Sequence, residues 1–249
     1  MDTRLSRVFL PLVAIAGLSI CVGAQAQPRD DTQWSITPYL WGTKTKVDLS
    51  VRDTNLGSGV ITFPDLLDVL DAAFMVHAET GAGRWSAFMD LTYLSTSDTR
   101  ERPLLTIDTD SEQTFLDAVA VFWPGGTGSS LSLFGGLRYS GFDDRYRFSA
   151  GGNVLGTQRS TDDYYDALLG LRYRFDLSER WALLTRGDMS FGDSEGTFLV
   201  QANFAYTVGS RRQNRVLFGY QYKQAEFKSG EVKTDFTYSG PMAGFNFRF

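Results

Sequence analysis

Alternation of apolar and polar residues with a period of two recurs along most of this chain and is its strongest structural constraint. It is clear over residues 84–93, 130–139, 164–175 and 198–208, where a long apolar face lies opposite a face bearing Arg, Asp, Asn or Ser. A period of two indicates β-strands. Beyond residue 26, no segment has the ~20 apolar residues of a membrane-spanning helix. Soluble β-sandwiches also alternate, but apolar faces that begin or end in aromatic residues favour an all-β, antiparallel transmembrane β-barrel.

The first 26 residues have the order of regions that defines a secretory signal peptide. Two arginines precede an apolar run over residues 8–23, and Ala24-Gln-Ala26 forms a cleavage site with small residues. A lipoprotein is the alternative, because Cys21 lies at the end of the run, but the isoleucine before it is larger than the small residue that a lipobox requires. We therefore expect residues 1–26 to be a cleaved signal peptide and residues 27–249 to form the exported barrel.

Composition excludes several classes of function. The chain has one Cys and one His, so it has neither a disulfide framework nor the residues of a Cys-based or His-rich metal site. Its formal net charge of -5 provides no basic surface for nucleic acid. We expect no cofactor, no bound metal and no nucleic-acid partner. Cleavage of the signal peptide would also remove the cysteine, which suits an oxidising compartment such as the periplasm.

Turn residues separate ten segments with strand patterns, and the lengths of the connections indicate a topology. Long polar connections are predicted near residues 97–110 and 141–160, and they alternate with short ones. In outer-membrane barrels short periplasmic turns alternate with longer extracellular loops, so both termini are expected in the periplasm and the number of strands is expected to be even. The predicted strands cover residues 33–43, 71–81, 84–97, 112–123, 130–147, 161–175, 180–191, 196–209, 214–228 and 232–249.

Residues 44–70 do not fit a simple up-and-down pattern. Segments 46–51 and 59–63 are interpreted either as a hairpin that extends from the first strand or as two further barrel strands, which would raise the number to twelve. Each is shorter than the ~9–11 residues that a strand needs to cross a bilayer, and this favours ten. Residues 64–71 have leucines at helical spacing and are predicted to form a short helix.

The carboxyl terminus carries the most specific motif of the chain. Phe245, Phe247 and Phe249 place aromatic rings at the last position and at the second and fourth positions before it. This pattern resembles the terminal signal that the barrel-assembly machinery of Gram-negative outer membranes recognises. A final strand has an edge that is unstable in hydrocarbon, so it must close against the first strand. The expected partners are outer-membrane lipid and the assembly machinery, and the barrel is expected to be a monomer.

Short motifs along the chain make it similar to a known group of barrels. They include Thr37-Pro-Tyr-Leu-Trp41, Phe63-Pro-Asp-Leu-Leu-Asp68, Gly136-Leu-Arg-Tyr139, Arg186-Gly-Asp188 and the ending after Gly244. With them the chain resembles a widespread family of proteobacterial outer-membrane β-barrels that has no agreed activity. The resemblance implies a barrel fold and an outer-membrane location, and it implies no reaction. A Met-Ser pair follows Arg186-Gly-Asp188 where the family usually has two glycines, so this segment carries no functional weight.

The sequence contains few residues that could form the active site of a barrel hydrolase. Barrel proteases and lipases need a positioned His as a base, and His77 is the one histidine of the chain. It shares a strand face with Glu79, and no Ser stands two residues from it, so a structural role in the lumen is favoured over hydrolysis. We predict a network of inward-facing polar residues that comprises His77, Glu79, Asp90, Asp117, Arg138, Asp166, Arg172, Arg174, Arg186 and Asp188.

The predicted lumen is narrow or occluded. A ten-stranded barrel lies between the filled eight-stranded class and the open sixteen-stranded porins. The inward acids and bases nearly balance, which argues against strong ion selectivity. Across neighbouring strands, Arg172 or Asp166 is expected near Arg186 or Asp188. The favoured function is a narrow channel or a barrel that binds small solutes. A structural or surface-interaction barrel is the alternative, and a membrane hydrolase is the least favoured class.

Overall fold

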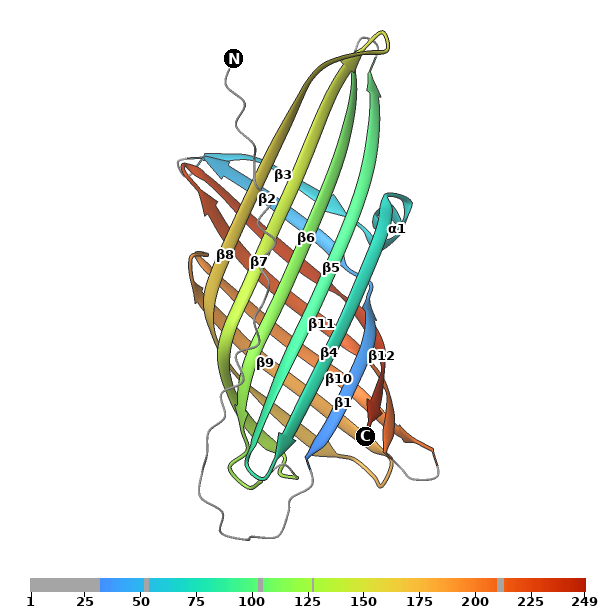
Figure 1. Ribbon diagram of the computed structural model, residues 1–249, viewed down its shortest axis with the longest axis vertical. Coiled ribbons are helices and arrows are strands. Elements are labelled where there is room, and N and C mark those ends of the chain that lie inside the picture. The colour runs from blue at the N-terminus through green and yellow to red at the C-terminus, as the bar shows by residue number, and fades with distance from the viewer. Residues whose placement is uncertain (1–31, 52–53, 103–104, 127, 210–212) are drawn as a thin grey trace, which may run out of the picture. The chain divides into compact units, whose positions relative to one another are not determined.

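The computed structural model describes residues 32–249 except 52–53, 103–104, 127 and 210–212; the predicted signal peptide with Cys21 lies outside the described residues. Ten antiparallel strands close into a barrel, and two further strands lie outside it (Figure 1). The predicted all-β antiparallel barrel of ten strands is confirmed. The barrel strands are β1 (Gln33–Trp41), β4 (Leu70–Ala82), β5 (Trp85–Arg102), β6 (Leu105–Phe122), β7 (Leu131–Ala150), β8 (Asn153–Asp176), β9 (Trp181–Gly192), β10 (Gly196–Val208), β11 (Asn214–Ser229) and β12 (Val232–Arg248).

β1 closes the barrel by pairing along both of its edges. On one edge Ile36 lies opposite Phe247 of β12, and on the other edge it lies opposite Ala78 of β4. The backbone N of Phe249 donates to the Trp34 carbonyl oxygen at 2.9 Å and extends the seam to the end of the chain. Pairing of the first and last strands removes a sheet edge that hydrocarbon does not tolerate.

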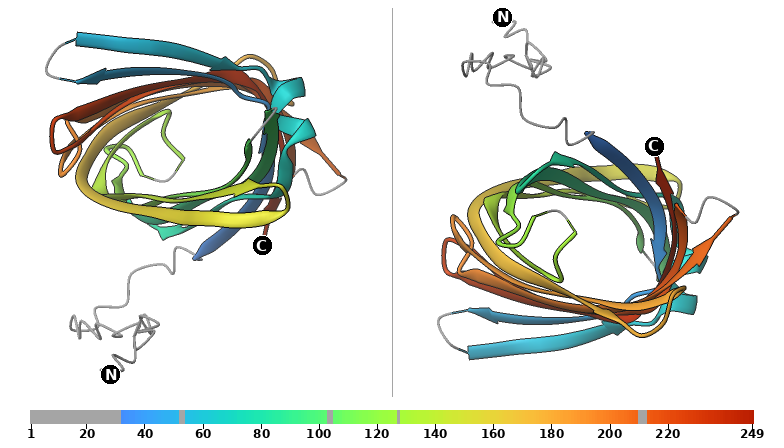
Figure 2. Two further views of the ribbon diagram at one scale, coloured as in Figure 1. Left: turned by 90° about the horizontal axis from the view of Figure 1, so that it is seen from above. Right: turned by 90° about the horizontal axis from the view of Figure 1, so that it is seen from below.

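Two short strands form a hairpin outside the ring. β2 (Lys44–Val51) pairs with β12 beyond the β1 contact, where Thr45 lies opposite Tyr238, and β3 (Thr54–Ile61) pairs with β2. Views along the barrel axis show the hairpin beside the ring (Figure 2). The hairpin interpretation of residues 44–70 is therefore confirmed, and the twelve-stranded alternative is wrong. Each strand has 8 residues, too few to span a bilayer.

The helix α1 (Phe63–Asp68) follows the hairpin and begins with a capping box. The Thr62 backbone N donates to Asp65 Oδ2 at 3.0 Å, and the Thr62 side chain accepts from the Asp65 backbone N. Hydrogen bonds from the side chain and backbone of Thr62 lower the pKa of the Asp65 carboxyl. The helix is shorter than the predicted 64–71, because Leu70 already begins β4. Among the described residues no helix is both long and apolar enough to cross a bilayer.

Two hairpins, β5–β6 and β7–β8, extend far beyond the other strands at the end opposite the C-terminus (Figure 1). β5 reaches Arg102 and β6 starts at Leu105, while β7 and β8 meet at a turn in which Gly151 has a φ of +56°. The predicted long loops at residues 97–110 and 141–160 are therefore wrong. These segments carry polar residues on both faces, so they lack the alternation of a half-buried strand, although their backbones remain paired.

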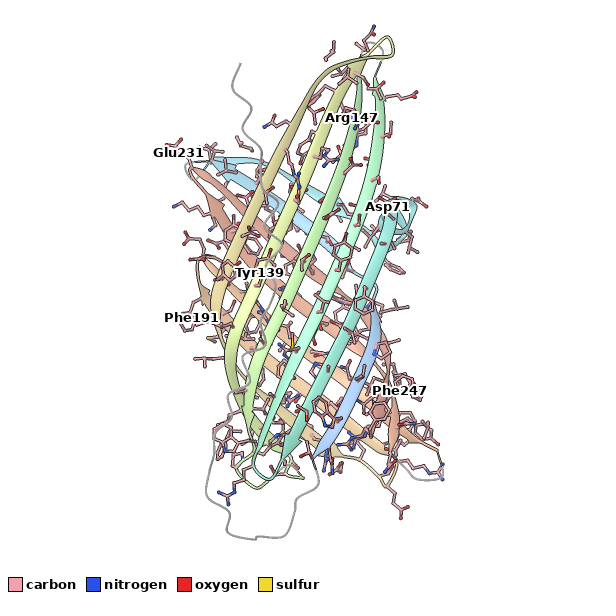
Figure 3. The ribbon with its side chains drawn as sticks, in the orientation of Figure 1. Asp71, Tyr139, Arg147, Phe191, Glu231 and Phe247 are labelled. Atoms are coloured by element: carbon pink, nitrogen blue, oxygen red, sulfur yellow. The ribbon has the colours of Figure 1, made fainter. Side chains whose placement is uncertain are left out.

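The outward face of the barrel is apolar over a broad belt. Leu40 is 70% exposed, Leu137 64% and Phe249 74%. Phe191 and Phe247 project from opposite sides of the barrel in the side-chain view (Figure 3). Other outward aromatic residues are Trp34, Phe74, Trp85, Tyr165, Trp181 and Phe204. An apolar belt with aromatic residues near its borders is the surface that a bilayer requires of a barrel.

Candidate functional site

A cluster of charged side chains fills one side of the lumen, and Arg138 of β7 lies at its centre. Arg138 is 2% exposed. Its Nε and Nη2 donate to the two carboxylate oxygens of Asp117 on β6, at 2.7 and 2.9 Å. Nη2 also donates to Asp188 Oδ1 on β9 at 3.0 Å, and Nη1 donates to Thr197 Oγ1 on β10 at 2.6 Å. A single arginine therefore connects four strands.

Arg186 of β9 completes the pairing of the same two aspartates. Its Nη2 donates to Asp117 Oδ2 at 2.8 Å, and its Nε donates to Asp188 Oδ2 at 2.6 Å. The ring of Phe88 lies against the guanidinium, with its centroid 5.2 Å from the Arg186 Cζ. Gly170 leaves room for this arrangement, because a Cβ there would lie 2.6 Å from the Asp188 Cβ. Two buried aspartates are thus paired with two arginines, as buried charges require.

A second part of the cluster bridges β8 and β4 through the lumen. Arg172 donates from Nη1 and Nη2 to both oxygens of Glu79, each at 2.9 Å. β8 and β4 are not neighbours in the sheet, so this bidentate pair crosses the interior. His77 and Asp90 join the two parts. The Nδ1 of His77 lies 3.0 Å from Asp90 Oδ2 and its Nε2 lies 3.5 Å from Glu79 Oε2, while Asp90 Oδ2 lies 3.9 Å from Arg186 Nη1. Tyr39 donates to the other oxygen of Asp90 at 2.7 Å.

We call this connected set the charge network: His77, Glu79, Asp90, Asp117, Arg138, Arg172, Arg186 and Asp188. The structure therefore brings together all of the polar residues predicted for the lumen except Asp166 and Arg174. The side chain of Asp166 is also buried and inward, but it accepts hydrogen bonds from Ser190 Oγ at 2.9 Å and from Ser194 Oγ at 2.6 Å. It thereby holds the connection between β9 and β10.

Arg174 lies nearer the end of the barrel that carries the C-terminus, with its Nε 3.1 Å from Asp176 Oδ1. The ladder contact expected for Arg172 also differs from the structure. Arg172 stands directly opposite Arg186 in the β8–β9 register, where two like charges meet, and it turns across the lumen to Glu79. Inward residues of this barrel therefore find their partners across the bore as well as on the neighbouring strand.

Six inward aromatic rings form a second layer of the lumen, on the side of the charge network that faces the tall hairpins. We call Phe115, Phe142, Tyr164, Phe227, Phe236 and Tyr238 the aromatic plug. Phe142 of β7 stacks on Phe236 of β12 with centroids 5.7 Å apart, and it meets Phe227 of β11 at 5.0 Å. β7 and β12 stand on opposite sides of the ring in the strand order. The plug therefore spans the bore with aromatic contacts.

A cavity of about 290 Å³ remains in the lumen, where residues of all ten barrel strands line it, among them every member of the charge network except Asp188. It extends from Arg248, at the end of the barrel that carries the C-terminus, to Trp41 and Lys223 next to the aromatic plug. In both axial views the connection between β6 and β7 overlaps the interior of the ring (Figure 2), and its residues Trp123 and Ser130 line the cavity. Arg174 Nη2 donates to the Gly128 carbonyl oxygen of this connection at 3.3 Å.

Three basic residues of the cavity are absent from the sequence-based network. They are Arg215 and Lys223 on β11 and Arg248 on β12. All three occupy inward positions of strands that alternate, so the same period-two analysis applied to residues 214–228 could have found the first two. With them, seven Lys and Arg side chains but only three Asp and Glu side chains line the cavity within the described residues. The expected near balance of lumen charges is therefore wrong for the cavity.

The Lys and Arg side chains of the cavity provide hydrogen-bond donors and positive charge that a ligand could contact. Both ring nitrogens of His77 lie against carboxylates, so neither is open to a substrate as a general base. In the part of the chain that the structure describes, no three His, Cys, Asp or Glu side chains are placed to hold a metal ion.

No protein-family model matches the sequence, and no curated protein matches it. Among solved structures, the outer membrane protease OmpT from Escherichia coli is similar with a TM-score of 0.53 and 10% identity, over 90% of this chain and 99% of that chain. Ail, the attachment invasion locus protein of Yersinia pestis, has a TM-score of 0.41 and 11% identity over 87% and 98% of the two chains. Neisserial surface protein A has a TM-score of 0.29 and 14% identity, over 85% of this chain and 97% of that chain. The likeness to OmpT shows a shared outer-membrane barrel fold alone.

Proposed function

We propose that this protein is an outer-membrane barrel that binds small polar solutes in a cavity entered from the periplasm, without passing them to the other side. The cavity itself carries the proposal, because charged and amide side chains line it and it ends next to the aromatic plug. Its volume of about 290 Å³ lies at the lower limit of typical ligand pockets, so the solute is small.

The orientation follows from the connections. At the end where the cavity opens no strand projects far beyond the ring, whereas the tall hairpins β5–β6 and β7–β8 extend far beyond the other strands at the opposite end (Figure 1). Outer-membrane barrels keep short turns in the periplasm and longer segments outside. The apolar belt then contacts outer-membrane lipid, and the protein is exported through its signal peptide. Because the ring of ten strands closes on itself, we extend the proposal to a monomer.

The tall hairpins favour a second function, contact with molecules outside the cell. β7 and β8 run to Ala150 and Asn153, and their upper parts are polar and partly or fully exposed. If this were the main function, the charge network and the aromatic plug would serve to stabilise the barrel, and access to the cavity would not matter. The two functions therefore differ in whether solutes reach the cavity from the periplasmic side.

Two lumen serines on either side of the aromatic plug allow a direct test. Ser35 lines the cavity, and Ser111 lies beyond the plug, where its hydroxyl donates to Asp144 Oδ1 at 2.6 Å. Both are partly buried and both are replaced by Cys in separate variants, Ser35→Cys and Ser111→Cys. The mature protein is refolded into lipid vesicles with the end of the barrel that carries the C-terminus toward the outer buffer, and protease cleavage of the tall hairpins checks the orientation. A small, charged, membrane-impermeant thiol reagent is then added outside.

We expect Ser35→Cys to react and Ser111→Cys to remain unmodified until detergent opens the vesicles. The detergent step shows that Ser111→Cys is reactive, and the protein without substitution gives the background. Equal modification of both variants before detergent would reveal an open pore and contradict the proposal. Protection of Ser35→Cys would show that solutes do not enter the cavity, and would favour the surface-contact function.

A further inference from the structure

We propose that the inner end of the cavity binds the carboxylate of a small organic anion, with the Lys223 ammonium as its charged partner. The inference rests on the proposed function and deepens it by naming the class of solute. Three features of the structure carry it: a buried cation without a counter-charge, a neighbouring indole N–H without an acceptor, and an arginine cluster at the entrance.

Lys223 is 5% exposed and lines the cavity wall. Within the described residues its ammonium has neither a hydrogen bond nor a carboxylate within ion-pair distance. The ring of Phe115 lies against the ammonium, with its centroid 3.7 Å from Nζ. A ring face attracts a cation, but an ammonium has three N–H donors to satisfy. The contacts of the described residues therefore leave the Lys223 ammonium incompletely partnered.

The charge network does not neutralise Lys223. Asp117 and Asp188 attract the ammonium, but Arg138 and Arg186 repel it. Each of the two aspartates already accepts hydrogen bonds from both arginines. Asp117 and Asp188 are thus matched by two guanidiniums, and neither is left to pair with the Lys223 ammonium. A buried charge without a partner is costly, so an anion in the cavity would stabilise the protein.

The surroundings of Lys223 favour an organic anion over an inorganic one. Trp41 is 8% exposed, and its Nε1–H is buried without an acceptor in the described structure. The same end of the cavity contains the apolar surfaces of Phe115, Met242 and Trp41. A carboxylate accepts hydrogen bonds and donates none, which matches the surplus of donors. An aromatic or aliphatic body attached to it would contact the apolar wall.

The entrance of the cavity is also positive. Arg174, Arg215 and Arg248 line it, and the charges of Arg174 and Arg248 repel that of Arg215. Arg174 is paired with Asp176, and Arg248 Nη2 donates to Gln33 Oε1 at 3.3 Å. Within the described residues the Arg215 guanidinium has no hydrogen bond. A mouth with this excess of positive charge raises the local concentration of anions and disfavours cations.

Benzoate is a suitable probe, with the neutral benzamide as its isostere. Binding of each to the refolded protein is measured by titration calorimetry, together with the variants Lys223→Met and Lys233→Met. Lys233 is the matched control, because it lies outside the cavity, is 37% exposed and is paired with Glu226 at 2.5 Å. We expect wild type to bind benzoate more tightly than benzamide. Lys223→Met should weaken benzoate binding at least about tenfold, which is the loss of one charged hydrogen bond, and Lys233→Met should not change it.

Several results would overturn the inference. They are the absence of saturable benzoate binding by wild type, equal affinities for benzoate and benzamide, or benzoate affinity that Lys223→Met leaves unchanged. If Lys223→Met fails to fold, the affinities of the wild-type protein for benzoate and benzamide still test whether the cavity selects a carboxylate. Reaction of Ser35→Cys together with any of these results would leave the periplasmic cavity in place and reject the anion as its solute.

Discussion

Replacement of Arg138 by methionine is expected to lower the free energy of unfolding by about 3–5 kcal/mol, and by less where cavity water reaches the site. Methionine keeps much of the length of the side chain but removes all donors. Asp117 and Asp188, which are 7% and 4% exposed, would then share Arg186 alone. The penalty arises because a buried carboxylate loses its charged partner without regaining water. Equilibrium unfolding in urea, with the barrel in lipid vesicles and tryptophan fluorescence as the signal, measures this loss.

Arg159→Met provides a matched control for Arg138→Met. Arg159 donates from Nε to Asp143 Oδ1 at 2.8 Å, and its side chain is 57% exposed on the tall hairpins. This hydrogen bond lowers the pKa of the Asp143 carboxyl. Exposed ion pairs contribute about 0–1 kcal/mol, so Arg159→Met should have little effect on unfolding. If both variants lost the same stability, the charge network would not hold the barrel together.

Deletion of Phe249 is expected to leave most of the protein unassembled in cells. The backbone N of Phe249 donates to the Trp34 carbonyl oxygen at the seam, and its ring is 74% exposed on the outward face. Removal of the residue shortens the seam and removes the aromatic terminus that the assembly machinery is expected to recognise. The fraction of heat-modifiable protein in isolated outer membranes, seen as a mobility shift on gels without boiling, measures assembly.

Phe249→Tyr is the control for the deletion. It keeps an aromatic ring and all backbone hydrogen bonds, so its assembly should stay close to that of wild type. The deletion should also impair refolding into vesicles less than assembly in cells, because vesicles contain no machinery that recognises the terminus. Equal assembly of wild type, Phe249→Tyr and the deletion in cells would reject a recognition role for the terminal aromatic residue.

The sequence predicted the ring because strand faces are a local property. Leu137 and Arg138 are neighbours in the chain, and the alternation alone assigns one to lipid and the other to the lumen; their exposed fractions of 64% and 2% confirm it. The same logic failed above the membrane, where residues 97–110 and 141–160 are polar on both faces. The strands nevertheless remain paired there, because the backbone register of each hairpin continues outward from the barrel.

The partners of the inward charges could not be predicted from neighbouring strands. A strand-by-strand analysis places Arg172 beside Arg186, and the structure has this register. The Nε of Arg172 donates to Ser132 of the neighbouring β7, but Nη1 and Nη2 donate to Glu79, four strands away in the sheet order. Such contacts depend on the curvature and stagger of the closed barrel, which alternation does not contain. The inward position of Lys223, by contrast, was available from the alternation of its own strand.

Planar-bilayer recording of the refolded wild-type protein tests the central claim, that the bore is blocked by the charge network and the aromatic plug. The heat-modifiable form in the same membranes confirms that the barrel has inserted. We predict no steady current at moderate voltages, because the aromatic contacts of Phe142 with Phe227 and Phe236 span the bore beyond the cavity. A stable, ohmic single-channel current from the folded protein would contradict the account and identify the lumen as a continuous pore.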